Sequence, residues 1–199
     1  MAARTVFFGA VGTAGQRCTS TRRLLLHSSI ADQFLEQLKS AYAQLKIGNP
    51  LDQGVLCGPL HTTAAREDYL HTIKQATTQG GHLVYGGESH TPDATELQSG
   101  VYVKPTIIRY PKNAIAKVME EECFAPILHC TTFDALEEAI AINNSVRQGL
   151  SSTLFTKNMS NVFHWIGPQG SDCGSEPYLL LSQLLPADTF ALSCKRQPV

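Results

Sequence analysis

The sequence predicts an α/β fold in which helices cover the faces of a sheet. Segments typical of strands alternate with segments typical of helices, and glycine, proline or asparagine residues separate them. Of the 199 residues, 43% are hydrophobic and 17% are charged, which is typical of a globular chain and not of a disordered one. This length is enough for one domain with a sizeable core.

The first predicted elements are a helix, a turn, a strand and a second helix. Residues 4–14 are rich in small and apolar side chains, so they predict a buried helix that ends in a glycine turn at 12–15. Residues 22–27 contain three consecutive leucines and predict a strand. Ser28 and Ser29 can then cap a helix over 30–46, whose apolar side chains repeat every three or four residues.

The middle of the chain predicts another helix and a group of short strands. Thr62 or Thr63 caps a helix that runs to about residue 78, and the pair Gly80 and Gly81 ends it. Its expected buried stripe consists of Ala65, Tyr69, Ile73 and Ala76. Strands are predicted over 82–85, 101–103 and 106–109, with a polar loop over 88–100 between the first two.

The last third of the chain predicts two more strand–helix pairs and a tail. A strand over 127–133 leads into a helix that Asp134 caps and that ends near Asn143. A strand over 150–155 and a short helix over 158–166 follow. Residues 175–199 show neither the strand period nor the helix period. We therefore predict a folded unit over 1–174 and an irregular tail over 175–199.

Charge and cysteine usage exclude several classes of function. The net charge is −1, so neither nucleic acid nor an anionic membrane is an expected partner. No apolar run approaches the roughly 20 residues that span a bilayer, and no secretory leader begins at Met1. The expected compartment is the cytoplasm or the mitochondrion. The 6 cysteines have no Cys-x-x-Cys spacing and the 7 histidines are scattered, so we expect reduced thiols and no metal site.

Cys18 is the first candidate for chemistry. An isolated cysteine in such a chain is most often a small core residue. Cys18, however, follows Gly12 and Gly15 in a turn, and Arg17 places positive charge beside the thiol, which favours the thiolate. A thiolate on a turn could attack a carbonyl carbon, and the N–H groups of the turn could stabilise the resulting oxyanion. From the residues alone, both interpretations stay open.

Glu122 and Phe124 form the second candidate. Three adjacent glutamates at 120–122 are usually a solvated surface run. Here they lead through Phe124 directly into a predicted buried strand, where a carboxylate could bind ribose hydroxyls and an aromatic ring could pack against a nicotinamide. The glycines at 9, 12 and 15 lack the Gly-x-Gly pair of a dinucleotide-binding loop, so helix packing explains them better.

Several segments together resemble the aldehyde dehydrogenases, and more narrowly family 7, the antiquitin or α-aminoadipic semialdehyde dehydrogenase family. The segments that carry the resemblance are 10–19, 41–44, 48–50, 58–62, 84–87, 124–128, 148–152, 155–157 and 167–174. They occur in the family's order over roughly residues 5–174. The resemblance implies the sheet and flanking helices of the family's catalytic domain.

The resemblance also implies roles for single residues. Cys18 matches the family's nucleophile, Glu122 the carboxylate that holds the nicotinamide ribose, and Phe124 the aromatic residue beside the nicotinamide. Arg17 matches the arginine that family 7 uses for the carboxylate end of a semialdehyde, a pairing that suits a guanidinium. The implied reaction is oxidation of an aldehyde, such as α-aminoadipic semialdehyde, to its carboxylate with NAD as cofactor.

The chain also departs from the family pattern. The family's Rossmann cofactor domain, its general-base glutamate and its oxyanion-hole asparagine belong to segments that these residues do not contain. After Gly174 the sequence departs from the family, whose next segments lead to the strand that builds its homotetramer. We therefore expect a fragment that is inactive alone. The alternatives are a non-enzymatic product, either a truncated isoform or a pseudogene-like chain, and a residual thiol reactivity at Cys18.

Overall fold

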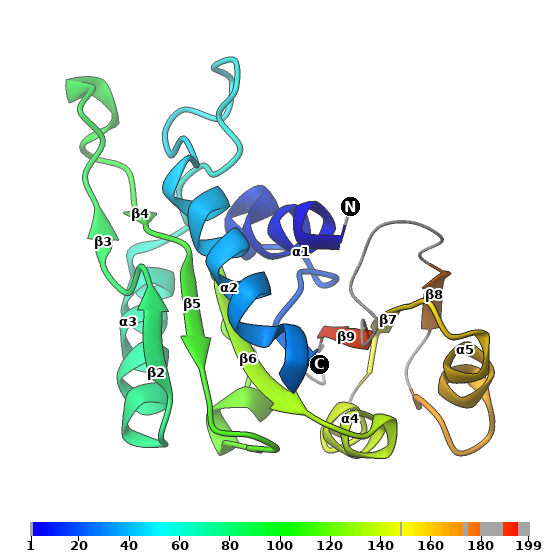
Figure 1. Ribbon diagram of the computed structural model, residues 1–199. Coiled ribbons are helices and arrows are strands. Elements are labelled where there is room, and N and C mark those ends of the chain that lie inside the picture. The colour runs from blue at the N-terminus through cyan, green and yellow to red at the C-terminus, as the bar shows by residue number, and fades with distance from the viewer. Residues whose placement is uncertain (1, 148, 173–174, 180–188, 195–199) are drawn as a thin grey trace.

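The computed structural model describes residues 2–147, 149–172, 175–179 and 189–194 (Figure 1). These residues form one central sheet, a small hairpin and flanking helices. The helices are α1 (Ala2–Val11), α2 (Ser28–Ala43), α3 (Thr63–Thr78), α4 (Leu136–Asn143) and α5 (Met159–Ile166), with short 3₁₀ turns at Gly12–Gly15, Thr95–Leu97 and Lys117–Glu120. The strands are β1 (Arg23–His27), β2 (His82–Tyr85), β3 (Ser89–His90), β4 (Tyr102–Val103), β5 (Thr106–Arg109), β6 (Ile127–Phe133), β7 (Ser151–Thr156), β8 (Ser175–Leu179) and β9 (Thr189–Cys194).

The central sheet is mixed, with the order β2-β5-β6-β1-β9-β7-β8. Its middle strands β5, β6 and β1 run parallel to one another, with Leu25 of β1 opposite Thr131 of β6. β9 pairs antiparallel with both β1 and β7, while β8 pairs parallel with β7. Strands β3 and β4 form a separate hairpin. The predicted α/β class is confirmed.

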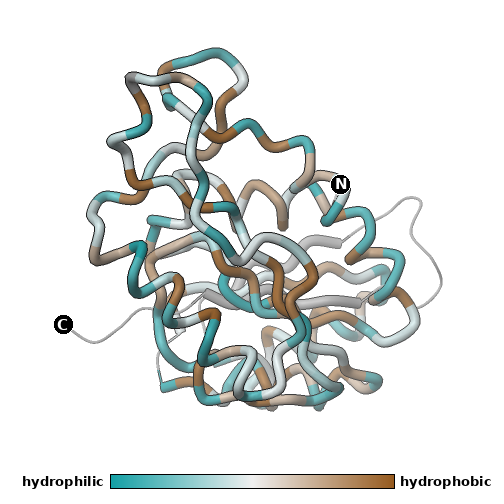
Figure 2. Tube along the Cα trace, turned by 90° about the vertical axis from the view of Figure 1, so that its left-hand side faces the viewer, coloured by the Kyte–Doolittle hydropathy of each residue, from teal (hydrophilic) through white to brown (hydrophobic). Residues whose placement is uncertain are grey.

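The three leucines of β1 show why both faces of the sheet are covered. Leu24 and Leu26 point to the face that α1 and α2 cover, whereas Leu25 packs with residues of α4 and α5 on the other face. Successive strand residues point to opposite faces, so a run without polar residues predicts burial on both sides. Figure 1 shows α2 in front of β5 and β6, and Figure 2 shows hydrophobic and hydrophilic residues mixed along most elements.

The residues that cap the helices in the structure agree only in part with the predicted caps. Thr62 caps α3 as predicted, since its Oγ1 accepts a hydrogen bond from the Ala65 N–H at 3.1 Å, and the predicted stripe of α3 is buried. The cap of α2 is instead His27, whose Nδ1 accepts from the Ser29 N–H at 3.3 Å. At α4, the Glu138 carboxylate accepts hydrogen bonds from the N–H groups of Asp134 and Ala135, which precede the helix. A side chain within the helix therefore stabilises its first turn.

The prediction of an irregular tail is wrong for residues 175–179 and 189–194, which are the strands β8 and β9. β9 lies between β1 and β7 and pairs with both along its length. Without it, each of those strands would present a row of unpaired backbone N–H and C=O groups, which a strand of almost any sequence can satisfy. The remainder of the predicted tail lies outside the described residues. Within the described part of the chain, no helix has the length and apolarity to cross a membrane.

Candidate active site around Cys18

The segment before Cys18 has an unusual backbone. Thr13, Ala14 and Gly15 all adopt left-handed conformations, with φ angles of 57°, 52° and 68°. Such angles suit glycine but are costly for residues with a Cβ, so they persist only where surrounding contacts impose them. The three residues turn the chain sharply at the end of α1 and carry it toward Cys18.

Cys18 lies at the second position of a tight turn over residues 17–20. The Ser20 N–H donates to the Arg17 carbonyl at 3.0 Å, and the Arg17 N–H donates to the Ser20 Oγ at 3.1 Å. Ser20 is fully buried, whereas Cys18 is exposed. Among the described residues, the N–H groups of Cys18 and Thr19 have no hydrogen-bond acceptor. An exposed thiol therefore lies beside two N–H groups that are free to bind a developing oxyanion.

Gly15 brings this turn against the segment that starts β6. A Cβ on Gly15 would lie 2.7 Å from the backbone atoms of Ala125 and Pro126, closer than any side-chain carbon can approach. The glycine is therefore required by its φ angle and by the close backbone contact. This contact brings the cysteine turn and the Glu122–Phe124 segment together.

A buried arginine joins the two segments. The Arg22 guanidinium donates to the carbonyl oxygens of Gly15 at 2.6 Å and Ala125 at 2.7 Å, and more weakly to that of Arg17 at 3.4 Å. The same group lies 3.9 Å from Glu122 Oε1 and 5.5 Å from the centre of the Phe124 ring. Arg22 is 6% exposed, so these contacts form in a nearly dry environment.

Glu122 and Phe124 thus belong to the segment that Arg22 and Gly15 hold against the cysteine turn. The Glu122 side chain is only 12% exposed and is not part of a solvated surface run. The Phe124 ring is 39% exposed and borders a small pocket of about 180 Å³ at the start of α3. One half-buried carboxylate and one accessible ring therefore lie on the segment that packs against the cysteine turn.

Arg17 lies beside the thiol in sequence but its guanidinium is directed toward α1. The group stacks over the Phe8 ring at 5.2 Å, and its Nη2 donates to the Phe8 carbonyl at 3.4 Å. Nη2 also occupies the space next to Gly12, where a Cβ would lie 2.5 Å from it. The Arg17 guanidinium is therefore held against Phe8, whose side chain is 54% exposed.

Sequence reasoning missed three residues of this site: Gln16, Ser20 and Arg22. Gln16 and Arg22 act through contacts with residues 43 and 103 positions away in the chain, which no local pattern reports. Ser20 offers a weak local signal, because serine is common in turns, where its hydroxyl can bond to a nearby backbone group. The two arginines in sequence at 22 and 23, just before the leucines of a buried strand, were the available signal for Arg22.

The other described cysteines are not candidates for the same chemistry. Burial raises the pKa of Cys57 to about 12 and raises the pKa values of Cys123 and Cys130 as well. A thiol with a raised pKa carries little thiolate near neutral pH. Within the described ranges, no group of three His, Cys, Asp or Glu side chains could hold a metal ion.

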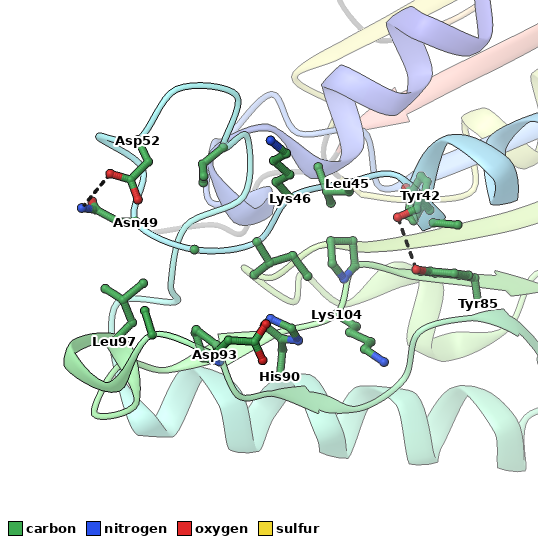
Figure 3. A pocket seen from close by; sticks show the side chains of 17 residues that line it. Tyr42, Leu45, Lys46, Asn49, Asp52, Tyr85, His90, Asp93, Leu97 and Lys104 are labelled. Carbon is green, nitrogen blue, oxygen red and sulfur yellow. Dashed lines mark hydrogen bonds between the residues drawn. The ribbon is translucent and has the colours of Figure 1, made fainter.

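A larger cavity of about 490 Å³ lies elsewhere, between the end of α2, the loop after it and the β3–β4 arm (Figure 3). Lys46, His90, Asp93 and Lys104 are among the residues that line it, and the Tyr85 hydroxyl donates to the Tyr42 carbonyl at 3.3 Å beside it. None of residues 12–22 and 122–124 lines this cavity. It is therefore separate from the Cys18 site.

Comparison with known proteins identifies the class to which this site belongs. The family model described as the aldehyde dehydrogenase family matches residues 1–174. The chain belongs to the aldehyde dehydrogenase family.

Members of family 7 are among its curated relatives. The chain is 53% identical over 174 residues to aldehyde dehydrogenase family 7 member B4 of Arabidopsis thaliana, covering 87% of this chain and 33% of the relative. It is 48% identical over 170 residues to α-aminoadipic semialdehyde dehydrogenase of Bos taurus, covering 85% and 30%. The chain thus spans about a third of the length of these relatives.

Two solved structures show the same fold in proteins that contain the cofactor. PnpE in complex with nicotinamide adenine dinucleotide matches with a TM-score of 0.78 and 32% identity, over 91% of this chain and 37% of that one. Betaine aldehyde dehydrogenase from Staphylococcus aureus in complex with NAD⁺ matches with a TM-score of 0.79 and 26% identity, over 89% and 36%.

Proposed function

We propose that this chain carries the nucleophile and the nicotinamide side of an NAD-dependent aldehyde dehydrogenase site, and that the aldehyde is a semialdehyde such as α-aminoadipic semialdehyde. The observation that carries the proposal is the exposed Cys18 thiol beside two unbonded N–H groups, joined through Arg22 to Glu122 and Phe124. The semialdehyde follows from the family 7 relatives, among them the α-aminoadipic semialdehyde dehydrogenase of Bos taurus.

The chemistry of this chain begins at the Cys18 sulfur. As the thiolate, it attacks the aldehyde carbon, a C–S bond forms, and the electron pair of the carbonyl moves to oxygen to give a thiohemiacetal oxyanion. The N–H groups of Cys18 and Thr19 can donate to that oxyanion. Arg17 directly precedes Cys18, and its guanidinium stacks on the exposed Phe8 ring; it is proposed to bind the carboxylate at the far end of the substrate.

The residues present fit the nicotinamide end of NAD. The accessible face of Phe124 at the 180 Å³ pocket can pack against a flat ring, and Glu122 can accept hydrogen bonds from ribose hydroxyls. NAD, when bound, supplies the acceptor for the hydride that leaves the substrate carbon. By the resemblance, the residues for its pyrophosphate and the general base belong to segments outside this sequence. We therefore propose that the chain alone does not complete turnover, since loss of a general base costs on the order of 100- to 10,000-fold.

A residual thiol reactivity is the second candidate function. Cys18 is exposed, while the other three described free cysteines are buried. Formation of an acyl or aldehyde adduct at Cys18 needs an accessible thiol that can react as the thiolate and N–H groups that can stabilise the oxyanion, but no cofactor.

The test compares the purified chain with Cys18→Ser and with Cys57→Ser as the matched control. Each protein is incubated with aldehyde and NAD, and NADH formation is followed by fluorescence. Each is also incubated with p-nitrophenyl acetate, and acylated residues are located by mass spectrometry. Acylation at Cys18 without NADH supports the thiol function, and NADH that disappears in Cys18→Ser supports the dehydrogenase. A chain with neither has the family's fold but not its chemistry.

A further inference from the structure

We propose that Arg22 is a positioning residue: its guanidinium fork holds the Cys18 turn in the conformation that stabilises a carbonyl adduct, and fixes that turn to the Glu122–Phe124 segment. The inference deepens the proposed function and rests on Cys18 being the nucleophile. It assigns a role to a side chain that does not itself reach the substrate.

The Arg22 guanidinium joins three backbone carbonyl groups on two segments of the chain. Nη2 donates to Gly15 and Arg17 on the cysteine turn, and Nη1 donates to Ala125 on the other segment. The two short bonds, at 2.6 and 2.7 Å, are to carbonyl oxygens and are charge-assisted. Two rigid donors set both segments at a fixed separation, which a single ammonium group cannot do.

These bonds hold the turn before Cys18 in a strained backbone conformation. Thr13 and Ala14 are left-handed although neither is a glycine, so the turn needs external contacts to keep its shape. The Gly15 carbonyl directly follows these residues, and the Arg17 carbonyl directly precedes Cys18. Arg22 therefore holds the turn on both sides of its sharp bend. If it were removed, the backbone before Cys18 could relax and the N–H groups of Cys18 and Thr19 would change direction.

The Arg22 guanidinium also contacts the two residues that are proposed to bind the nicotinamide end of NAD. The same guanidinium lies 3.9 Å from Glu122 Oε1 and over the Phe124 ring. A guanidinium this close to a half-buried carboxylate and an aromatic ring restricts the orientation of both side chains. Arg22 thus sets the position of Glu122 and Phe124 relative to the thiol, which a reaction between two bound groups requires.

Arg23 provides a matched control on the same strand. It is 2% exposed, and it too donates to two carbonyl oxygens, those of Ile142 at 2.8 Å and Asn143 at 2.9 Å. Those carbonyls belong to the end of α4 and not to the Cys18 turn. Arg22 and Arg23 are therefore alike in burial and bonding but differ in what they hold.

The experiment measures two reactions of Cys18 in the full chain, in Arg22→Gln, Arg22→Lys and Arg23→Gln, with Cys18→Ser as the background. Acylation by p-nitrophenyl acetate passes through an oxyanion, whereas alkylation by iodoacetamide does not. In both Arg22 variants we expect acylation to fall about 10- to 100-fold, because oriented donors contribute that much, while alkylation changes less than about threefold. In Arg23→Gln both rates should stay within about threefold of the parent.

Four results would overturn the proposed role of Arg22 and leave Cys18 as the proposed nucleophile. Full acylation in Arg22→Lys would mean that charge suffices and the fork is not needed. An equal loss of acylation in Arg23→Gln would indicate general destabilisation. An equal loss of both reactions in the Arg22 variants would place the defect in the thiol itself. Loss of folding in both Arg22 variants, seen by circular dichroism while Arg23→Gln folds, would make Arg22 a folding residue. A parent that is alkylated but not acylated at Cys18 would instead overturn the proposed nucleophile, and the inference with it.

Discussion

The Gln16 carboxamide clamps His61 to the cysteine turn. Its Oε1 accepts the His61 N–H at 3.0 Å and lies 3.1 Å from the His61 Nδ1, while its Nε2 donates to the Pro59 carbonyl at 3.1 Å. Because Thr62 then caps α3, this one side chain connects the turn that carries Cys18 to the start of a helix. The cysteine turn is thus held from two directions, by Gln16 on one side and by Arg22 on the other.

Replacing Gln16 should loosen this connection. Gln16→Leu keeps the volume but removes the bonds to Pro59 and His61, so we expect a loss of about 1–2 kcal/mol in the free energy of unfolding. Gln44→Leu is the control, because the Gln44 side chain is exposed and donates to a nearby carbonyl, that of Ser40 in α2, at 3.0 Å. Urea denaturation measures both. Equal losses in the two variants would show that Gln16 does not act as a clamp.

Gly15 should tolerate no side chain. In Gly15→Ala the new methyl group would meet the backbone of Ala125 and Pro126 at 2.7 Å, in addition to the strain of a positive φ. We expect a loss of about 3–5 kcal/mol or failure to fold. Gly80→Ala shares a positive φ of 89° but meets nothing within 4 Å, so it should cost only about 1–2 kcal/mol. Denaturant titration of the two variants gives the difference, and similar costs would contradict the close contact.

The elements that the sequence predicts well are those with local signals. α3 begins at its threonine cap and ends before a glycine pair, and the buried face has the predicted four residues. The predicted strand over 127–133 is the observed β6. In each case the signal depends on residues close together in the chain, and the tertiary packing favours the same element as this local signal.

The site was predictable only in part, for the same reason. Cys18 stands out because a glycine turn precedes it. The role of Arg22 depends on its contact with Ala125, which is 103 residues away in the chain. β9 was missed because its strand character comes from the open edges of β1 and β7 and not from its own pattern. Contacts between distant segments decide both cases.

Truncation of two aromatic residues of α5 should change the free energy of unfolding by very different amounts. Trp165 is fully buried with Leu25 and Phe133, and its Nε1 donates to the Ser152 Oγ at 3.3 Å. Trp165→Ala should therefore cost about 3–5 kcal/mol. Phe163, two residues earlier, is 66% exposed, so Phe163→Ala should change the free energy of unfolding by less than about 0.5 kcal/mol. Urea denaturation followed by circular dichroism compares them, and a large effect at Phe163 would mean that another surface covers it.

His129 should make the fold sensitive to acid. Burial, with Arg22 and Arg23 as further causes, lowers the pKa of this histidine from 6.5 to about 3, and its Nδ1 lies 3.0 Å from the Tyr110 hydroxyl. Between pH 6.5 and 3 the unfolded chain binds a proton at this site and the folded chain does not. The contribution of neutral His129 is therefore fully present above pH 6.5 and is lost as the pH falls toward 3.

The expected result is a free energy of unfolding that falls by up to about 1.4 kcal/mol per pH unit from this group between pH 6 and pH 4. In His129→Gln that slope should decrease, because glutamine takes up no proton, even if the variant is less stable at pH 7. His71→Gln, at an exposed position of α3, should keep the slope of the parent. Urea titrations at several pH values measure the three slopes. A slope that is the same in His129→Gln as in the parent would show that other groups, and not this buried imidazole, set the acid limit of the fold.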